Sequence, residues 1–221
     1  MMAKKKKSVE KDAHVQAADD GQCRIPPVNR HIVSFRIRST SPMIQHCWPE
    51  KAKEMMRQKH AGKKTRNRDV RDPEQEAKDA AYTTRDGEHA IPGMGLKGAI
   101  LSAAHKDIGT PRSLVQKALF LHGCDSDMLI PIECEEPYMR EDPVTVGTST
   151  DLRYRPCFEE WAVDVTFEID LDLLQVSDLI NLANRAGFGV GICEWRPEKG
   201  GEYGRFEVDP TSPVTCEPVK Q

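Results

Sequence analysis

The sequence lacks paired cysteines, long apolar runs and an apolar leader. Its seven cysteines are scattered and include no Cys-x-x-Cys pair, which excludes a zinc ribbon and provides no disulfide framework. No apolar run approaches the roughly 18 residues of a transmembrane helix. The opening Met-Met-Ala-Lys-Lys-Lys-Lys is not followed by the apolar stretch of a secretory signal. These absences predict a reduced, cytoplasmic protein that makes no contact with membranes.

Motifs of the common catalytic sites are also absent. The chain has no His-Glu-x-x-His, no Walker loop and no Gly-x-Ser-x-Gly. His46 and Cys47 lack the two further ligands that a zinc site would need, so we expect no metal and no cofactor. One catalytic alternative stays open, a metal-independent endoribonuclease in which His46 or His89 acts as general acid or base.

The charges are divided unevenly along the chain. The formal net charge is only −3, yet residues 51–71 hold nine basic residues against Glu54 and Asp69. Residues 125–178 reverse this balance, with fifteen carboxylates against three arginines. A basic segment on an acidic body predicts a local contact with a polyanion, in which Lys63, Lys64, Arg66 and Arg68 hold phosphates. The acidic half would face a basic neighbour, including another copy of the chain.

Hydrophobic periodicity and turn residues predict a mixed order of strands and helices. Alternating residues predict strands at 31–38, 128–132, 138–146, 160–169, 188–193 and 203–208, the last two forming a hairpin. Proline starts and apolar stripes predict helices after Pro49 and at 74–81, 92–106, 112–120 and 173–185, the last with Gly187 as its C-cap. We expect a disordered basic tail at 1–27, one domain at 28–210 with an insertion at 40–90, and a flexible tail at 211–221.

This order predicts an α+β, ferredoxin-like (RRM-like) βαββαβ core with a basic, partly helical insertion after the first strand and a C-terminal hairpin. Helices would cover one face of its antiparallel sheet and leave the other open. Arg36 and Arg38 alternate with apolar residues on the first strand, so we expect them on the open face, as nucleic-acid contacts.

The stretch Ile-Pro-Gly-Met-Gly-Leu-Lys-Gly at 91–98 predicts a helix start that can approach a phosphate. Gly93, Gly95 and Gly98 remove side chains there, and Lys97 supplies a positive charge. Tight packing of a glycine-containing helix on a sheet explains the same residues equally well.

Two further clusters combine cations with an aromatic ring. Arg153, Tyr154 and Arg155 would support a nucleic-acid strand through guanidinium and ring faces, unless Tyr154 packs and the arginines pair with local carboxylates. Trp195 and Arg196, with Lys199, form a second cluster of this kind, although for Trp195 a structural role is slightly favoured over base stacking.

The 91–98 stretch resembles the I-P-G-S-S-L-K-G signature of the RAMP superfamily, the RNA-binding backbone proteins of CRISPR effector complexes. Met94 and Gly95 replace its two serines. Residues 187–191, Gly-Phe-Gly-Val-Gly, are similar to the glycine-rich loop of that superfamily. In the superfamily an excursion after the first strand kinks the bound RNA, and the basic 51–71 segment has the matching position. Target-cleaving members use an aspartate after the first strand, and residues 39–49 contain none, which argues against target cleavage. Residues 139–143 and 151–156 resemble uncharacterised phage proteins.

The sequence therefore predicts non-catalytic binding of single-stranded RNA, or single-stranded DNA, through backbone phosphates. The protein would be a head-to-tail homo-oligomer, or a subunit of a larger ribonucleoprotein of the CRISPR kind. The alternatives are an endoribonuclease of the same fold, and a phage-encoded interaction, anti-defence or structural protein.

Overall fold

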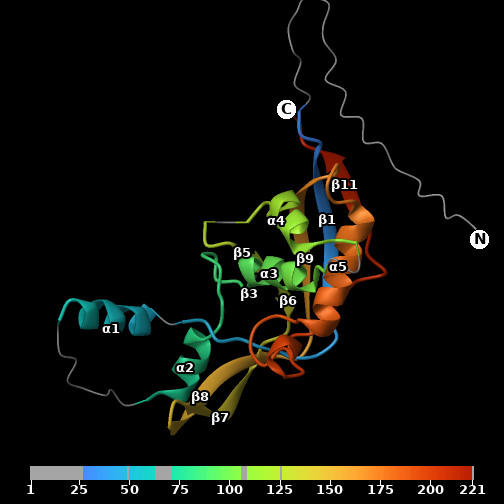
Figure 1. Cartoon of the computed structure of the whole chain (residues 1–221). Coiled ribbons are helices and arrows are strands. Elements are labelled where there is room, and N and C mark those ends of the chain that lie inside the picture. Colours follow the sequence, from blue (N-terminus) through green and yellow to red (C-terminus); the bar gives the residue numbers. More distant parts are fainter. Residues whose placement is uncertain (1–26, 49, 63–70, 106–108, 125, 221) are drawn as a thin grey trace, which may run out of the picture.

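The computed structural model describes residues 27–48, 50–62, 71–105, 109–124 and 126–220 (Figure 1). Within these residues the chain forms five α-helices and antiparallel sheets, which confirms a mixed α+β fold. The tail predicted for residues 1–27 lies outside the described residues, apart from Pro27.

The largest sheet is built around two long neighbouring strands, β1 (Arg30–Ser39) and β9 (Trp161–Asp170). They pair antiparallel from Arg30 opposite Asp170 to Arg38 opposite Ala162. Two short strands, β10 (Phe206–Val208) and β11 (Thr215–Pro218), pair with the other edge of β1. Two more, β4 (Leu119–Leu121) and β6 (Glu133–Cys134), pair with the other edge of β9. Every pairing in this sheet is antiparallel.

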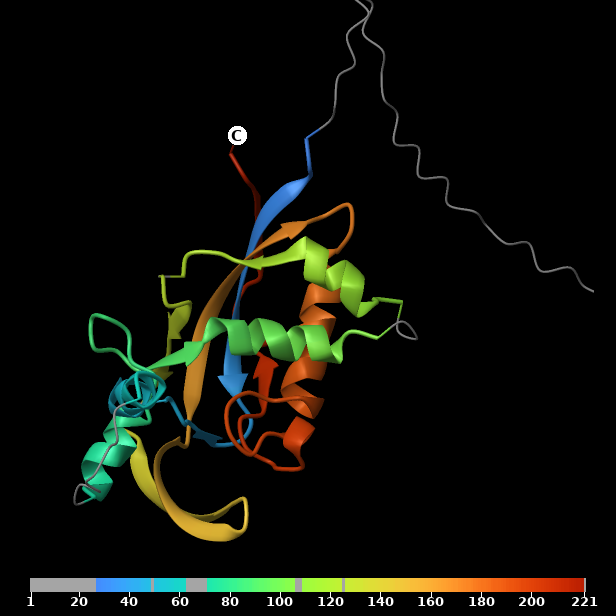
Figure 2. The ribbon, with the colours of Figure 1, turned by 60° about the vertical axis from the view of Figure 1, so that its left-hand side comes forward.

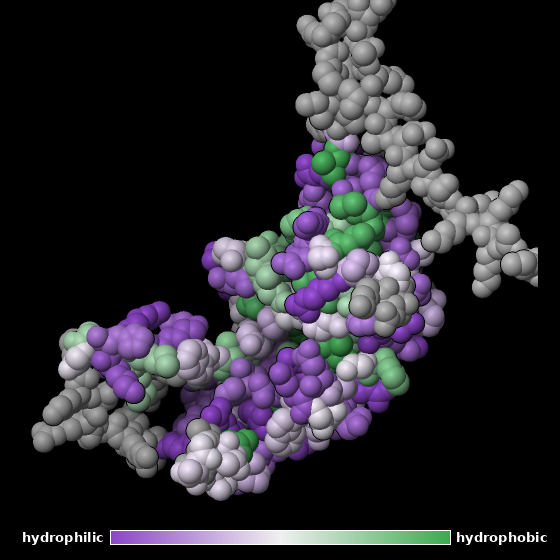
Figure 3. Space-filling view, viewed as in Figure 1, coloured by the Kyte–Doolittle hydropathy of each residue, from purple (hydrophilic) through white to green (hydrophobic). Residues whose placement is uncertain are grey.

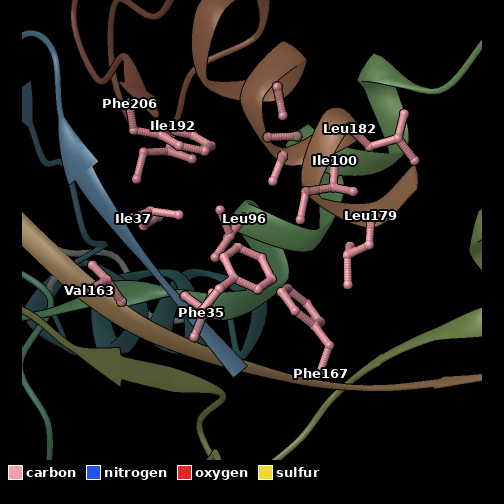
Figure 4. Packing of buried hydrophobic residues seen from close by; sticks show 14 of the residues in the cluster. Phe35, Ile37, Leu96, Ile100, Val163, Phe167, Leu179, Leu182, Ile192 and Phe206 are labelled. Atoms are coloured by element: carbon pink, nitrogen blue, oxygen red, sulfur yellow. The ribbon is translucent and has the colours of Figure 1, made fainter. Parts of the chain in front are cut away.

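The core lies between this sheet and two helices, α3 (Gly93–Ala103) and α5 (Val176–Gly189). Alternation along β1 sends Phe35 and Ile37 into it, and β9 contributes Val163 and Phe167 in the same way (Figure 4). Burial of each such side chain stabilises the fold by about 1.5–3 kcal/mol. Helices α3, α4 (Arg112–Ala118) and α5 lie on one face of the sheet (Figure 2). The opposite face carries the polar residues of β1 and β9, and we call it the polar face.

Between β1 and α3 the chain makes the predicted excursion. It contains β2 (Met43–Ile44), α1 (Glu50–His60), α2 (Pro73–Asp79) and β3 (Ala90–Pro92). Asp72 caps α2 by accepting a hydrogen bond from the Gln75 amide, and Pro73 occupies its first turn. Helix α1 projects from the body, on the same side as the junction between β3 and α3 in both ribbon views (Figures 1 and 2).

A long hairpin lies beside the excursion. Its strands are β7 (Tyr138–Val146) and β8 (Ser149–Phe158). Strand β2 pairs with β8, and α2 packs against the hairpin. Strand β3 pairs with β5 (Leu129–Pro131) and so joins the excursion to the middle of the chain.

Three predictions in the C-terminal part are wrong. Gly187 is not a C-cap but lies within α5, where a Cβ atom would come 1.9 Å from the Phe206 carbonyl oxygen, so glycine permits close contact between helix and strand. Residues 188–193 form the end of α5 and a turn instead of a strand, and η2 (Pro197–Lys199) follows them. The region 211–221 contains β11, which pairs with His31–Ser34 of β1. Its side chains are exposed, so only backbone pairing identifies it as a strand.

Candidate nucleic-acid interface

Carboxylates on the polar face of the sheet pair with the arginines of β1. Arg36 donates hydrogen bonds to Asp164 at 2.9 Å and to Glu133, and Arg38 donates to Glu207 at 2.6 Å. The hydrogen bonds that the arginines donate to Glu133 and Glu207 raise the pKa of Arg36 and of Arg38. Arg36 and Arg38 do lie on the predicted face, but they would have to leave these partners to bind phosphate. Neither arginine is therefore part of the candidate site.

A shallow cleft at one end of the polar face is strongly acidic. Its volume is about 750 Å³, and Arg38 is the single cation among the residues that line it. Its acidic lining residues are Glu133, Glu135, Glu159, Glu160 and Glu207. Such a surface repels phosphate and attracts basic groups.

The start of α3 is explained mostly by packing. The Gly93 amide donates to the Met128 carbonyl oxygen at 2.8 Å, and a Cβ atom on Gly93 would lie 2.9 Å from that oxygen. Glycine is therefore required for the approach of the two backbones, and its amide is not available to an anion. At Gly95 a Cβ would meet the Pro92 ring at 3.3 Å, whereas at Gly98 it would meet nothing within 4 Å. Of these three glycines, only Gly98 is not required by packing.

Lys97 lies over the ring of Phe120, with its Nζ 4.7 Å from the ring centroid. Burial lowers the pKa of Lys97, and no described carboxylate forms an ion pair with it. Sequence analysis singled out Lys97 but missed Phe120, because it placed Phe120 at the end of a helix at 112–120. The structure ends α4 at Ala118 and places Phe120 in β4. The predicted cation at this helix start is thus present, next to a half-exposed aromatic ring.

The structure separates the residues of the Arg153–Tyr154–Arg155 cluster. Neighbouring residues of β8 point to opposite faces, so Tyr154 lies beneath Arg71 at 5.3 Å, away from the two arginines. Arg153 donates to Nε2 of His46 at 2.6 Å. Arg155 is only 2 % exposed and donates to Asp142 at 2.8 Å. The prediction that Arg155 contacts nucleic acid directly is therefore wrong.

Arg155 belongs instead to an arginine–aromatic cluster, which we define as Arg140, Asp142, Arg155, Trp195 and Tyr203. Asp142 accepts hydrogen bonds from both arginines, and Arg140 also donates to the Tyr203 hydroxyl at 3.2 Å. Burial acts to raise the pKa of Asp142, but these hydrogen bonds outweigh it and hold that pKa below its usual range. Sequence analysis missed Arg140 and Asp142. In the hairpin Arg140 lies opposite Arg155 and Asp142 lies opposite Arg153, and this alternation of charges could have indicated ion pairs between the two strands.

A strained loop holds Trp195 in this cluster. Cys193 and Trp195 have φ angles of 62° and 49°, which side-chain-bearing residues rarely adopt. A Cβ atom on Gly201 would lie 1.7 Å from the Trp195 carbonyl oxygen, so the return path of the loop requires glycine. Strain of this kind persists only where the surroundings enforce it. The loop conformation therefore fixes the position of Trp195 against the hairpin.

The two histidines proposed as catalytic are each engaged by a neighbour. His46 accepts from Arg153 through Nε2, which leaves its proton on Nδ1, and burial lowers the pKa of His46. The His89 ring packs edge-on against Phe158, with centroids 5.2 Å apart. In the part of the chain that the structure describes, no group of three or more potential ligands could hold a metal ion.

The basic excursion is only partly described. Lys53 and Arg57 pair with Glu50 and Glu54 within α1, at 2.7 and 3.3 Å, in solvent-exposed contacts that stabilise little. The surface over α1 is largely hydrophilic (Figure 3). The predicted contacts Lys63, Lys64, Arg66 and Arg68 lie outside the described residues.

Comparison with protein-family models found no match, and comparison with curated proteins found no similar sequence. The resemblance to the RAMP superfamily therefore depends on the quoted residues alone. None of the described helices combines the length and apolar character needed to cross a membrane.

Proposed function

We propose that this protein binds single-stranded nucleic acid, with RNA as the preferred ligand, without cleaving it. The observation that carries the proposal is the separation of charge. The arginines of the sheet are neutralised on an acidic polar face, whereas the chain gathers nine basic residues against two carboxylates at 51–71, in an excursion whose helix α1 projects from the body. Lys53, Arg57 and Arg71 pair with carboxylates, so the excess positive charge of this segment comes from the other six. A projecting cationic segment can follow a phosphate backbone while the acidic cleft stays clear of it.

Strand order supports the finer fold assignment. The two short strands at each edge, β10 with β11 and β4 with β6, each occupy one position in the sheet, so the sheet has four positions. Across the sheet these positions are β10/β11, β1, β9 and β4/β6. Numbered along the chain, their order is 4-1-3-2. A ferredoxin-like βαββαβ core has this order, with both helices on one face. Together with the Ile91–Gly98 stretch, it supports a RAMP-like protein, in which Lys97 and the excursion hold the backbone.

Self-association is part of this proposal. Copies would associate head to tail along the nucleic acid, because one molecule carries both an acidic cleft and a basic excursion. Such unlike surfaces favour open, heterologous contacts over a closed two-fold dimer.

Fluorescence anisotropy with labelled 20-nucleotide RNA, single-stranded DNA and double-stranded RNA tests binding. We expect tight, salt-sensitive binding of the single strands and weaker binding of the duplex. The RNA recovered after incubation should be intact on a denaturing gel, with or without EDTA. Cleavage would favour the endoribonuclease, and the lack of any binding at low salt would favour an interaction or structural protein.

A further inference from the structure

Phe120 is an exposed aromatic residue on an edge strand. It lies in the middle of β4 and is 51 % exposed, whereas its neighbour Leu119 is fully buried. Alternation along the strand turns Phe120 away from the core, toward the side on which Glu168 lies across the pairing of β4 and β9. Glu168 is held by Arg30, so its charge is compensated. The packing of the fold does not require a large aromatic ring at this position.

The start of α3, whose Lys97 contacts the Phe120 ring, combines exposed apolar residues with this one cation. Met94 and Met128 are 58 % and 42 % exposed, and the hydrogen bond from Gly93 to Met128 brings their segments together. Apolar residues reach the surface near β5 and the start of α3 (Figure 3). Lys97 lies over the Phe120 ring at 4.7 Å, and no described carboxylate pairs with it.

We propose that Phe120 is a stacking platform for a base of single-stranded nucleic acid, and that Lys97 holds the adjoining phosphate. This inference rests on the proposed function and adds to it a residue that binds a base beside Lys97. An aromatic face with a neighbouring cation binds single strands without regard to sequence, because every base has a π face and every nucleotide a phosphate. A purely apolar protein partner would leave the charge of Lys97 uncompensated.

Phe188 provides a natural comparison. It is 73 % exposed, and Arg205 lies over its ring at 5.2 Å. Arg205, however, has a carboxylate partner in Glu202 at 3.7 Å, and the hollow that Phe188 borders contains one carboxylate, Asp178, and one further cation, Arg185. The cation beside Phe188 is therefore already compensated, and we expect no base to bind there.

The test measures the affinity of 15-nucleotide oligo(U) and oligo(A) RNA for variants of Phe120 in the full chain. We expect F120A to weaken binding of both about tenfold, F120L to weaken it nearly as much, and F120W to retain it. K97A should weaken binding of both RNAs equally. F188A is the matched control and should bind as the unaltered protein does. Thermal melts establish that each variant is folded.

Leucine separates stacking from apolar contact, because it preserves the apolar surface without a π face. Normal binding by F120L alongside weak binding by F120A would replace stacking with apolar contact and overturn the inference. Photocrosslinking with 5-iodouridine RNA gives an independent readout in the unaltered protein, and we expect a crosslink in the peptide that contains Phe120. Crosslinks only elsewhere, with normal binding by F120A, would overturn the inference and leave the proposed function standing. No binding by the unaltered protein would overturn the proposed function itself.

Discussion

The guanidinium of Arg155 lies against the indole of Trp195, with its Cζ atom 4.7 Å from the ring centroid. The two residues come from different parts of the chain, the β7–β8 hairpin and the loop after α5. In its own sequence context Arg155 was a candidate for nucleic-acid contact, whereas a structural role was favoured for Trp195. In the folded protein they bind each other, so they join the hairpin to the main body instead of forming an open surface.

Asp142 should be essential to this junction. It is 4 % exposed and accepts hydrogen bonds from Arg140 and Arg155, so D142A would leave the buried Arg155 and the half-buried Arg140 without the carboxylate that they share. We expect a loss of about 3–5 kcal/mol in the free energy of unfolding. Chemical denaturation of the variant and the unaltered protein checks this. A change below about 1 kcal/mol would contradict the role given to Asp142.

The same carboxylate predicts the direction of a pH effect. The pKa of Asp142 is lowered in the folded state, so its contribution is fully present above the unfolded pKa of about 3.9 and is lost as pH falls through the folded value. The difference in stability between the unaltered protein and D142N should therefore be level near pH 6 and shrink as pH falls below about 3.9 toward pH 3. A difference that stays constant over this range would contradict the prediction.

Gly93 and Gly98 should respond oppositely to alanine. At Gly93 the new Cβ would lie 2.9 Å from the Met128 carbonyl oxygen, so we expect destabilisation by about 1–3 kcal/mol. At Gly98 it meets nothing, so the higher helix propensity of alanine should stabilise the protein by about 0.5–1 kcal/mol. Thermal melts of both variants decide this. Equal losses would show that both glycines pack tightly.

The basic excursion should determine the salt dependence of RNA binding. Replacement of Lys63, Lys64, Arg66 and Arg68 by alanine removes four cations from the 51–71 segment. If all four contact phosphate, the slope of log affinity against log salt should fall by about 3. Anisotropy titrations at several salt concentrations measure it. An unchanged slope would exclude these residues from the interface.

The acidic cleft should contribute to self-association and not to RNA binding. E159K/E160K reverses two of its five glutamate charges, at exposed positions away from the core. We expect weaker self-association by light scattering, with no loss of RNA affinity per protomer at dilutions where the protein is monomeric. A closed dimer that neither RNA nor this variant affects would contradict head-to-tail assembly.

Local patterns in the sequence were sufficient for most of the secondary structure. The alternation at 31–38 and 160–169 predicted β1 and β9, because a half-buried strand must place apolar side chains on one face. Proline at a first helical turn predicted α2 in the same way. Gly187 was misassigned because a glycine inside a helix and one at its end look alike in sequence, and only the contact with Phe206 distinguishes them.

The sequence by itself determined the alternation of the long strands, the uneven charge and the position of the excursion, since these depend on neighbours along the chain. Only the tertiary structure decided which charges remain available. Arg36 faces Asp164 because of the register between β1 and β9, and Arg155 is buried because a distant loop returns over the hairpin. Lys97 lies on Phe120 for the same kind of reason, because a helix packs beside an edge strand. Cross-strand and helix–strand contacts join residues far apart in the chain, and no local pattern specifies them.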